Sequence, residues 1–146
     1  MLSHTELMES WAKDSTIDPT QLMHTMYGHP MLHSRYLTHL QTYKQGLRKH
    51  MGKYQKMKLI KQRYFFGELT KEELVLYNLP QYLFKRPLKS ELESLLDADS
   101  ELQTIQDQCV YLESLVQACE SILKDINSRY FLFKTIAEYE RFQSGS

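Results

Sequence analysis

The stretch that decides the fold runs from Leu95 to Phe133 and reads LLDADSELQTIQDQCVYLESLVQACESILKDINSRYFLF. Its apolar residues follow a heptad repeat without a slip. One position of the repeat holds Leu95, Leu102, Cys109, Val116, Leu123 and Tyr130, and the other holds Ala98, Ile105, Leu112, Cys119, Ile126 and Phe133. A period of about 3.5 residues keeps one face of a helix apolar along its length, and that face needs a partner helix to cover it. The stretch therefore predicts one long helix that packs along a continuous seam.

A capping box marks the expected start of this helix. Ser90 and Glu93 have the spacing at which a hydroxyl and a carboxylate satisfy the first free backbone amides. The acidic run Asp97-Ala98-Asp99-Ser100-Glu101 then lies inside the helical pattern and is expected on the outer face of the helix. This run lacks the glycine of a calcium-binding loop, which argues against a metal site there.

The seam is expected to join several copies of the chain. Val110, Leu115 and Ile122 widen the apolar stripe, which favours contact with more than one neighbouring helix. A helix of a single-chain bundle is the alternative, because bundle cores use the same packing geometry. The expected oligomerisation residues are Leu95, Leu102, Ile105, Cys109, Leu112, Val116, Cys119, Leu123, Ile126, Tyr130 and Phe133.

The residues before this helix predict further helices. Only 5 Gly and 4 Pro occur among 146 residues, which favours helix throughout. The patterns predict a helix from Ser3 to Lys13, a helical start at Asp18–Gln21, a helical run to Phe66 that is broken or kinked near Gly28–Pro30, and a short helix from Thr70 to Leu76. The aromatic rings of the connector, residues 78–87, are expected to pack it down onto the rest of the chain.

A block of positive charge lies on the long helical run. The chain has 18 basic and 18 acidic residues, yet the block contains eight cations and no acid. Its members are Lys44, Arg48, Lys49, Lys53, Lys56, Lys58, Lys61 and Arg63. Such segregation forgoes the ion pairs of an ordinary solvated helix, so it indicates a polyanionic partner. Tyr64 and Phe65 follow the block, and flat rings beside cations suit an unpaired nucleic-acid strand.

The helical period places these charges on faces. Most of the cations fall opposite an apolar face made by Tyr36, Leu40, Tyr43, Leu47, Tyr54 and Met57. Lys58 and Lys61 instead rotate towards that apolar face. A basic amphipathic helix can also lie on an anionic membrane, but the tyrosine-rich apolar face disfavours this reading.

Neither an enzyme nor a metal protein is indicated. The sequence contains no nucleotide-binding loop, nucleophile elbow or zinc-protease motif. His29 and His33 lie four residues apart, but no cysteine or carboxylate pair lies nearby in sequence to complete a metal site. Cys109 and Cys119 occupy the seam and lie too far apart along one helix to form a disulfide within the chain. We expect no cofactor.

The expected architecture is all-α with two regions. We expect residues 1–88 to form a helical region that binds an unpaired nucleic-acid strand, and residues 89–146 to form a coiled-coil oligomerisation helix. No signal peptide is recognised, and no apolar run approaches the roughly 18 residues of a transmembrane helix. We therefore expect a soluble, cytoplasmic protein.

Several segments in order resemble the UvsY-type recombination mediators of tailed bacteriophages, over nearly the whole chain. They are Trp11-Ala12-Lys13-Asp14 with Ile17-Asp18, His33-Ser34-Arg35-Tyr36-Leu37, Lys61-Gln62-Arg63-Tyr64-Phe65-Phe66-Gly67, Leu95-Leu96-Asp97-Ala98-Asp99, and Asn127-Ser128-Arg129-Tyr130-Phe131 with Arg141-Phe142. The resemblance implies a non-enzymatic protein that forms a ring-like homo-oligomer of the hexamer or heptamer class. It also implies single-stranded DNA, a phage RecA-like recombinase and the phage single-strand-binding protein as partners, in an infected bacterium.

The family's DNA-contacting motif is a lysine, a small residue, an arginine and a leucine. Its nearest match here is Lys61-Gln62-Arg63-Tyr64, in which Gln and Tyr replace the small and aliphatic residues. An alternative register places Lys58 first. The remaining alternative for function is a coiled-coil scaffold whose basic helix docks an acidic protein.

Overall fold

The computed structural model describes residues 1–145, which form the all-α fold that the sequence predicts. The elements are α1 (His4–Asp14), the 3-10 turn η1 (Pro19–Gln21), α2 (Leu22–Phe65), α3 (Lys71–Leu76), α4 (Lys89–Asp97) and α5 (Ser100–Gln143). They form two compact units, one of Met1–Gly46 with Leu112–Ser146 and one of Leu47–Tyr111. No helix among the described residues combines the length and the apolar character that crossing a bilayer requires.

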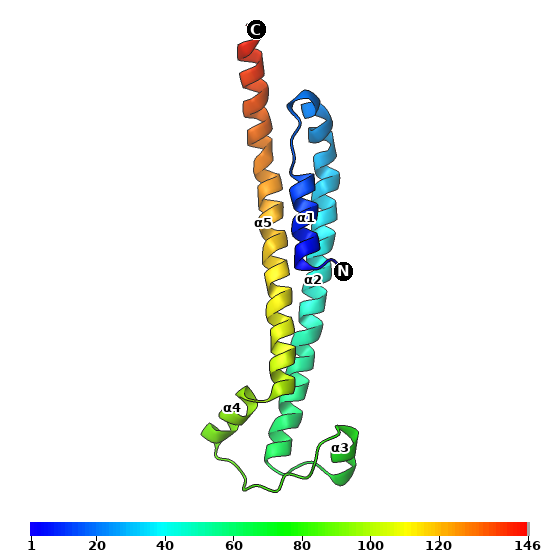
Figure 1. Ribbon diagram of the computed structural model, residues 1–146, viewed down its shortest axis with the longest axis vertical. Helices are drawn as coiled ribbons and strands as arrows, with labels where there is room; N and C mark the ends of the chain where they lie inside the picture. Colours follow the sequence, from blue (N-terminus) through cyan, green and yellow to red (C-terminus); the bar gives the residue numbers. More distant parts are fainter. Residues whose placement is uncertain (146) are drawn as a thin grey trace. The chain divides into compact units, whose positions relative to one another are not determined.

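The first unit is a three-helix arrangement in which α1 lies beside the first part of α2 and the second part of α5 (Figure 1). Ser3 and Glu6 form a reciprocal capping box at the start of α1. Two buried tyrosines of α2 hold α1 and its leading residues: Tyr36 donates its hydroxyl to Asp14 at 2.8 Å, and Tyr43 donates to the Leu2 carbonyl at 2.9 Å. Burial raises the pKa of Tyr36 to about 12, so this donor stays protonated.

Helix α2 is less interrupted than the sequence suggests. Asp18 accepts a hydrogen bond from the Thr20 amide and opens η1, as its position predicts. Of the two outcomes expected near Pro30, a break or a kink, the break is wrong, because Pro30 lies inside a continuous helix of 44 residues. Proline removes one hydrogen bond of the helical ladder, and the tertiary packing of the residues around it, such as the buried His29, offsets that loss.

The apolar face predicted for α2 is confirmed. Its members in the first unit are fully buried, and its members in the second unit are half-buried. The exposures of Tyr36, Leu40 and Tyr43 are 0%, 7% and 0%. This face provides a partner within the chain for the seam of α5.

The expected single helix after Ser90 is instead two helices. Helix α4 begins at Lys89, where the Leu88 amide donates to Glu91, so the predicted Ser90–Glu93 box is wrong. Helix α4 ends at Asp97, and α5 begins at Ser100. The Asp99 carboxylate accepts from the Leu102 amide at 3.0 Å. Asp is a strong N-cap residue, and here a new helix start takes precedence over helix continuation.

The chain itself buries most of the predicted seam. Nine of the eleven expected oligomerisation residues are buried in the single chain: Leu102, Ile105, Cys109, Leu112, Val116, Cys119, Leu123, Ile126 and Phe133. Leu95 lies in α4 and is half-buried, and Tyr130 is 50% exposed. A heptad pattern has the same form whether the covering helix is intramolecular or intermolecular. Oligomerisation through these residues stays a prediction.

A buried histidine joins α2 to α5 in the first unit. His29 is 2% exposed and lies edge-on to Phe133, with ring centroids 4.9 Å apart. Its Nδ1 is 3.3 Å from the Thr25 carbonyl, which fits an Nδ1–H donor, and its buried Nε2 has no hydrogen-bond partner within the described chain. Nearby, the Arg129 guanidinium donates to the Ser15 carbonyl at 2.7 Å and lies over the Trp11 ring.

The second unit is built around a small apolar cluster. Leu92 and Leu96 of α4 and Leu102 of α5 form its buried centre, against which Tyr54, Met57, Phe65 and Phe66 of α2 pack. Figure 1 shows α3, α4 and the connector gathered around the end of α2. The cluster fixes the α4–α5 turn against the helix that carries the basic block.

One cation of the basic block is part of this unit's interior. Lys61 is 6% exposed, and its Nζ lies 3.2 Å from Asp99 and 3.9 Å from Glu101. Asp99 therefore caps α5 and pairs with Lys61 of α2 at the same time. A buried charge needs a partner, and removing one member of such a pair leaves the other uncompensated.

We expect Lys61→Met to lower the free energy of unfolding by about 3 kcal/mol, because Asp99 would keep a desolvated charge without its cation. Urea unfolding followed by circular dichroism measures this loss. Lys56→Met is the matched control at an exposed position of the same helix, and it should change stability by less than about 0.5 kcal/mol, as surface changes usually do. Equal effects of the two substitutions would show that the Lys61 pair does not hold the unit together.

Stability should also fall in mild acid because of His29. Burial lowers the pKa of His29, with Arg129 adding to the shift, so the unfolded chain takes up a proton that the folded chain refuses. The contribution of neutral His29 is therefore complete above the unfolded pKa of about 6.5. It is lost as pH falls from there towards the folded pKa. Thermal melting between pH 7.5 and 5 measures the slope.

His29→Leu should flatten this pH slope, and His24→Leu, at an exposed position of the same helix, should leave it unchanged. Part of the slope that remains in His29→Leu would come from His39, because burial also lowers the pKa of His39. An unchanged slope in His29→Leu would contradict the assignment.

Candidate nucleic-acid interface

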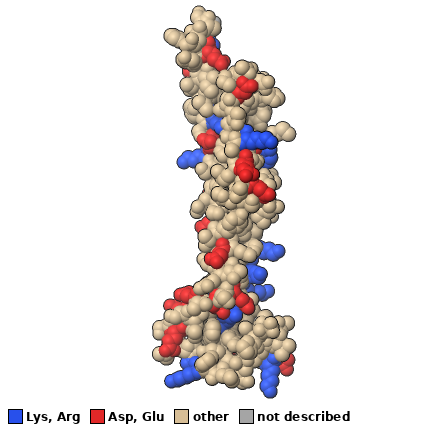
Figure 2. Space-filling model, in the orientation of Figure 1, with Lys and Arg blue, Asp and Glu red and all other residues tan. Residues whose placement is uncertain are grey.

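The exposed cations that α2 contributes to the second unit form one surface. We call Arg48, Lys49, Lys53 and Lys56 the basic face. They lie at steps of three, four and eight residues, which brings them to adjacent rows of one helix side. Figure 2 shows basic side chains along this side of α2, whereas acidic ones gather over α4 and the start of α5. Within residues 1–145, no ion pair engages any of these four cations.

A glycine lies in the middle of the basic face. Gly52 is four residues after Arg48 and four before Lys56, so it shares their row. A Cβ placed on Gly52 would meet nothing within 4 Å. Glycine inside an exposed helix costs about 1 kcal/mol relative to alanine. The packing of the free chain supplies no reason for that cost, whereas at Gly46 a Cβ would lie 3.6 Å from Leu112.

The two cations that were predicted to rotate away from the main face do so. Lys58 is half-buried, and Lys61 is buried and paired with Asp99. The helical period therefore places their side chains correctly. The acidic partners of Lys61 lie about 40 residues away in sequence, which is why the block itself gives no sign of the pair.

Arg63 is also engaged within the second unit. Its guanidinium donates two hydrogen bonds to the Glu73 carboxylate, at 2.8 and 3.0 Å. The hydrogen bond from Arg63 lowers the pKa of Glu73, and the same bond raises that of Arg63. Glu73 also completes the predicted capping box of α3 with Thr70. Lys44, in the first unit, lies 3.8 Å from Glu120, and both side chains are exposed.

The aromatic residues after the block support the connector. Tyr82 lies edge-on to both Tyr64 and Phe65, with ring centroids 5.5 Å apart in each pair. Both Tyr64 and Phe65 are half-buried, and Phe65 also packs against the apolar cluster. Their rings are therefore partly occupied by the chain's own side chains.

The connector presents more apolar surface than the sequence suggests. Its rings are expected to pack down, and Tyr82 does so, but Phe84 is 79% exposed and Leu83 is 81% exposed. The Arg86 guanidinium lies over the Phe66 ring at 4.6 Å. One sequence feature points to this segment: no aspartate or glutamate occurs between Glu73 and Glu91.

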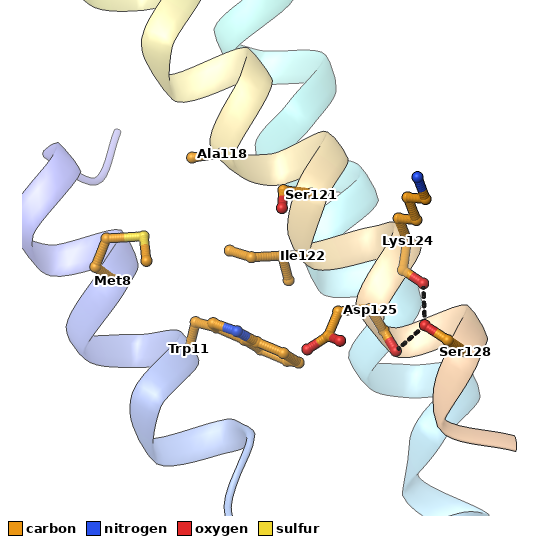
Figure 3. A pocket seen from close by; sticks show the side chains of 8 residues that line it. All are labelled: Met8, Trp11, Ala118, Ser121, Ile122, Lys124, Asp125 and Ser128. Carbon is orange, nitrogen blue, oxygen red and sulfur yellow. Dashed lines mark hydrogen bonds between the residues drawn. The ribbon is translucent and has the colours of Figure 1, made fainter. Parts of the chain in front are cut away.

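One hollow of the first unit is lined by residues of α1 and α5. It has a volume of about 360 Å³ and lies between α1 and α5 (Figure 3). The Trp11 ring points from α1 towards Ile122 and Asp125 of α5, and Ser128 donates to the carbonyls of Lys124 and Asp125. Within residues 1–145, no three histidine, cysteine or acidic side chains are placed to hold a metal ion.

Comparisons with known proteins agree with the resemblance in the sequence. The family model described as "Recombination, repair and ssDNA binding protein UvsY" matches residues 10–146. The recombination protein uvsY of Enterobacteria phage T4 is 29% identical over 143 residues, which cover 96% of each chain.

Solved structures of a relative share the fold. One crystal structure of the bacteriophage T4 recombination mediator protein UvsY matches with a TM-score of 0.85 at 24% identity, covering 99% of both chains. Another matches with a TM-score of 0.82 at 25% identity, covering 94% of this chain and 98% of the other. The chain therefore belongs to the UvsY family, and it is a non-enzymatic recombination mediator and repair protein that binds single-stranded DNA.

Proposed function

We propose that single-stranded DNA binds across the basic face of α2, and that this binding helps a phage RecA-like recombinase load onto DNA covered by single-strand-binding protein. The observation that supports the site is the set of four exposed cations that have no ion partner among residues 1–145. Such cations stay available for phosphates, and each phosphate they neutralise releases condensed counterions.

The other residues predicted to bind DNA are proposed to act in different ways. Lys58 adds charge at the edge of the basic face. Lys61 and Arg63 have carboxylate partners, so reaching a phosphate would require them to give up an ion pair. We assign them the positioning of α3, α4 and the α5 start around α2. Tyr64 and Phe65 support the connector. Lys44 is an exposed cation of the first unit and is proposed to contact phosphate there.

Gly52 is proposed as the point where the DNA backbone comes closest to the helix. Glycine lets a ligand approach main-chain atoms that a side chain would cover. Here it leaves an open patch surrounded by all four cations of the basic face. Local features that lower helix stability without a packing reason are typical of functional sites.

We also propose a ring-like homo-oligomer of the hexamer or heptamer class, in the cytoplasm of an infected bacterium. The C-terminal part of α5 supports association, because several large apolar side chains there are exposed: Tyr130, Phe131, Leu132, Tyr139 and Phe142. Residues 1–88 would then contribute DNA contacts and residues 89–146 the assembly. Copies in a ring raise the effective concentration of each basic face and can strengthen binding by about 10²–10⁴-fold.

The triple substitution Lys49→Ala, Lys53→Ala and Lys56→Ala should weaken binding to oligo-dT. Losing three phosphate contacts per binding face should reduce the magnitude of the log Kd against log salt slope by about 2. Fluorescence anisotropy between 50 and 300 mM NaCl measures both effects, and light scattering should show unchanged assembly.

A matched control removes the same charge elsewhere. Lys13, Lys124 and Lys134 are exposed lysines of the first unit, and their triple alanine variant should bind oligo-dT as the wild type does. If both triple variants lose affinity equally, net charge rather than the basic face controls binding. If neither loses affinity while binding of an acidic protein is lost, the basic face is a protein-docking scaffold.

Gly52→Ala should stabilise the protein by about 1 kcal/mol and yet weaken DNA binding, because the methyl group improves helix propensity and occupies the backbone approach. Chemical unfolding and anisotropy measure the two quantities. Gly28→Ala is the control, since Gly28 also lies exposed in α2 with nothing within 4 Å of an added Cβ. It should raise stability without changing affinity. Equal DNA affinity in both variants would exclude the close approach at Gly52.

A further inference from the structure

The connector has the composition of a nucleic-acid contact. The connector and the residues that flank it, 74–90 together, contain no acid, three cations and three aromatic rings. The cations are Lys85, Arg86 and Lys89, and the rings are Tyr77, Tyr82 and Phe84. Phosphates attract such cations, and every base has a face that can stack on an aromatic ring. None of these residues belongs to the basic face of α2.

A ladder of rings fixes the connector to the end of α2. Phe84 lies 5.5 Å from Tyr82 between ring centroids, and Tyr82 in turn contacts Tyr64 and Phe65. The outermost ring, Phe84, is 79% exposed, so most of its surface is open to solvent. Anchored rings lose little conformational freedom when a ligand binds, which is what a stacking platform requires.

Cations flank the exposed ring. Lys85 is exposed and has no ion pair within residues 1–145. Arg86 lies over Phe66, which holds its guanidinium in place, and its only carboxylate in the described chain, Glu68, is 4.0 Å away. Both partners of that pair are exposed, so its contribution is small and phosphate can replace it.

We propose that the connector is a second single-stranded DNA subsite, in which Phe84 stacks on an unpaired base and Lys85 and Arg86 contact the neighbouring phosphates. This inference rests on the DNA binding proposed above and adds a base contact to a site otherwise made of charges. The acid-free, cation-flanked setting favours DNA over a protein as the occupant, because exposed apolar residues alone would suit either.

The experiment separates binding through base stacking from binding through phosphate charge. Two oligonucleotides of equal length are compared by anisotropy: oligo-dT, and an abasic strand that keeps the phosphates and sugars but has no bases. Phe84→Ala should weaken oligo-dT binding about tenfold, within the range of a single base–aromatic stack. Binding of the abasic strand should be unchanged, because the cations remain.

Neighbouring variants serve as controls. Leu83→Ala removes a comparably exposed apolar side chain without a ring, and should bind both strands as the wild type does. Phe84→Trp should retain oligo-dT binding, whereas Phe84→Leu should lose it as Phe84→Ala does. Because Phe84 is exposed, all of these variants should melt at the wild-type temperature.

Failure of this inference is separable from failure of the proposed function. The triple lysine variant of α2 should weaken binding of both strands, whatever happens at Phe84. If Phe84→Ala binds both strands like the wild type, or weakens both equally, base stacking at the connector is excluded. Loss of recombinase loading in Phe84→Ala with full DNA affinity would likewise overturn it and assign the surface to a protein.

Discussion

The burial of the α5 seam by the chain's own helices is the constraint on which the rest of the structure depends. In the first unit, buried α5 residues face α1 and the tyrosines of α2; in the second, Leu102 joins a cluster with α4 and α2. Once that seam is covered on one side of α2, the helical period sends Arg48, Lys49, Lys53 and Lys56 to the opposite side. The basic face is thus a consequence of core packing as much as of charge.

The sequence predicts those features whose causes are local. Capping at Asp18 and Thr70, the apolar face of α2 and the rotation of Lys58 and Lys61 all follow from spacing along the chain. The break before Ser100 and the continuity through Pro30 do not, because tertiary contacts decide them: Asp99 is drawn into an ion pair with Lys61, and packing around His29 carries the helix past the proline. A heptad pattern likewise does not tell whether the helix that covers the seam belongs to the same chain or to another copy.

The site shows the same division between local and distant causes. Eight cations in one block look equivalent in the sequence, yet they fall into exposed, half-buried and ion-paired groups once Glu73, Asp99 and Glu120 are placed. Composition identifies the class of ligand, since polyanions are attracted by unbalanced charge wherever it lies. It does not identify which side chains are free, because the acids that engage them lie elsewhere in the chain. The exposure of Phe84 is missed for a related reason: aromatic residues in a short connector usually pack inwards.

The dual engagement of Asp99, which both caps α5 and neutralises Lys61, has a consequence for how the family varies. A replacement at either position leaves a charge or a helix end unsatisfied, so relatives that change one should change the other in step. Covariation of positions 61 and 99 across an alignment would then reflect the ion pair between them and not a contact with DNA. Retention of a lysine at position 61 would then be explained by its pair with Asp99.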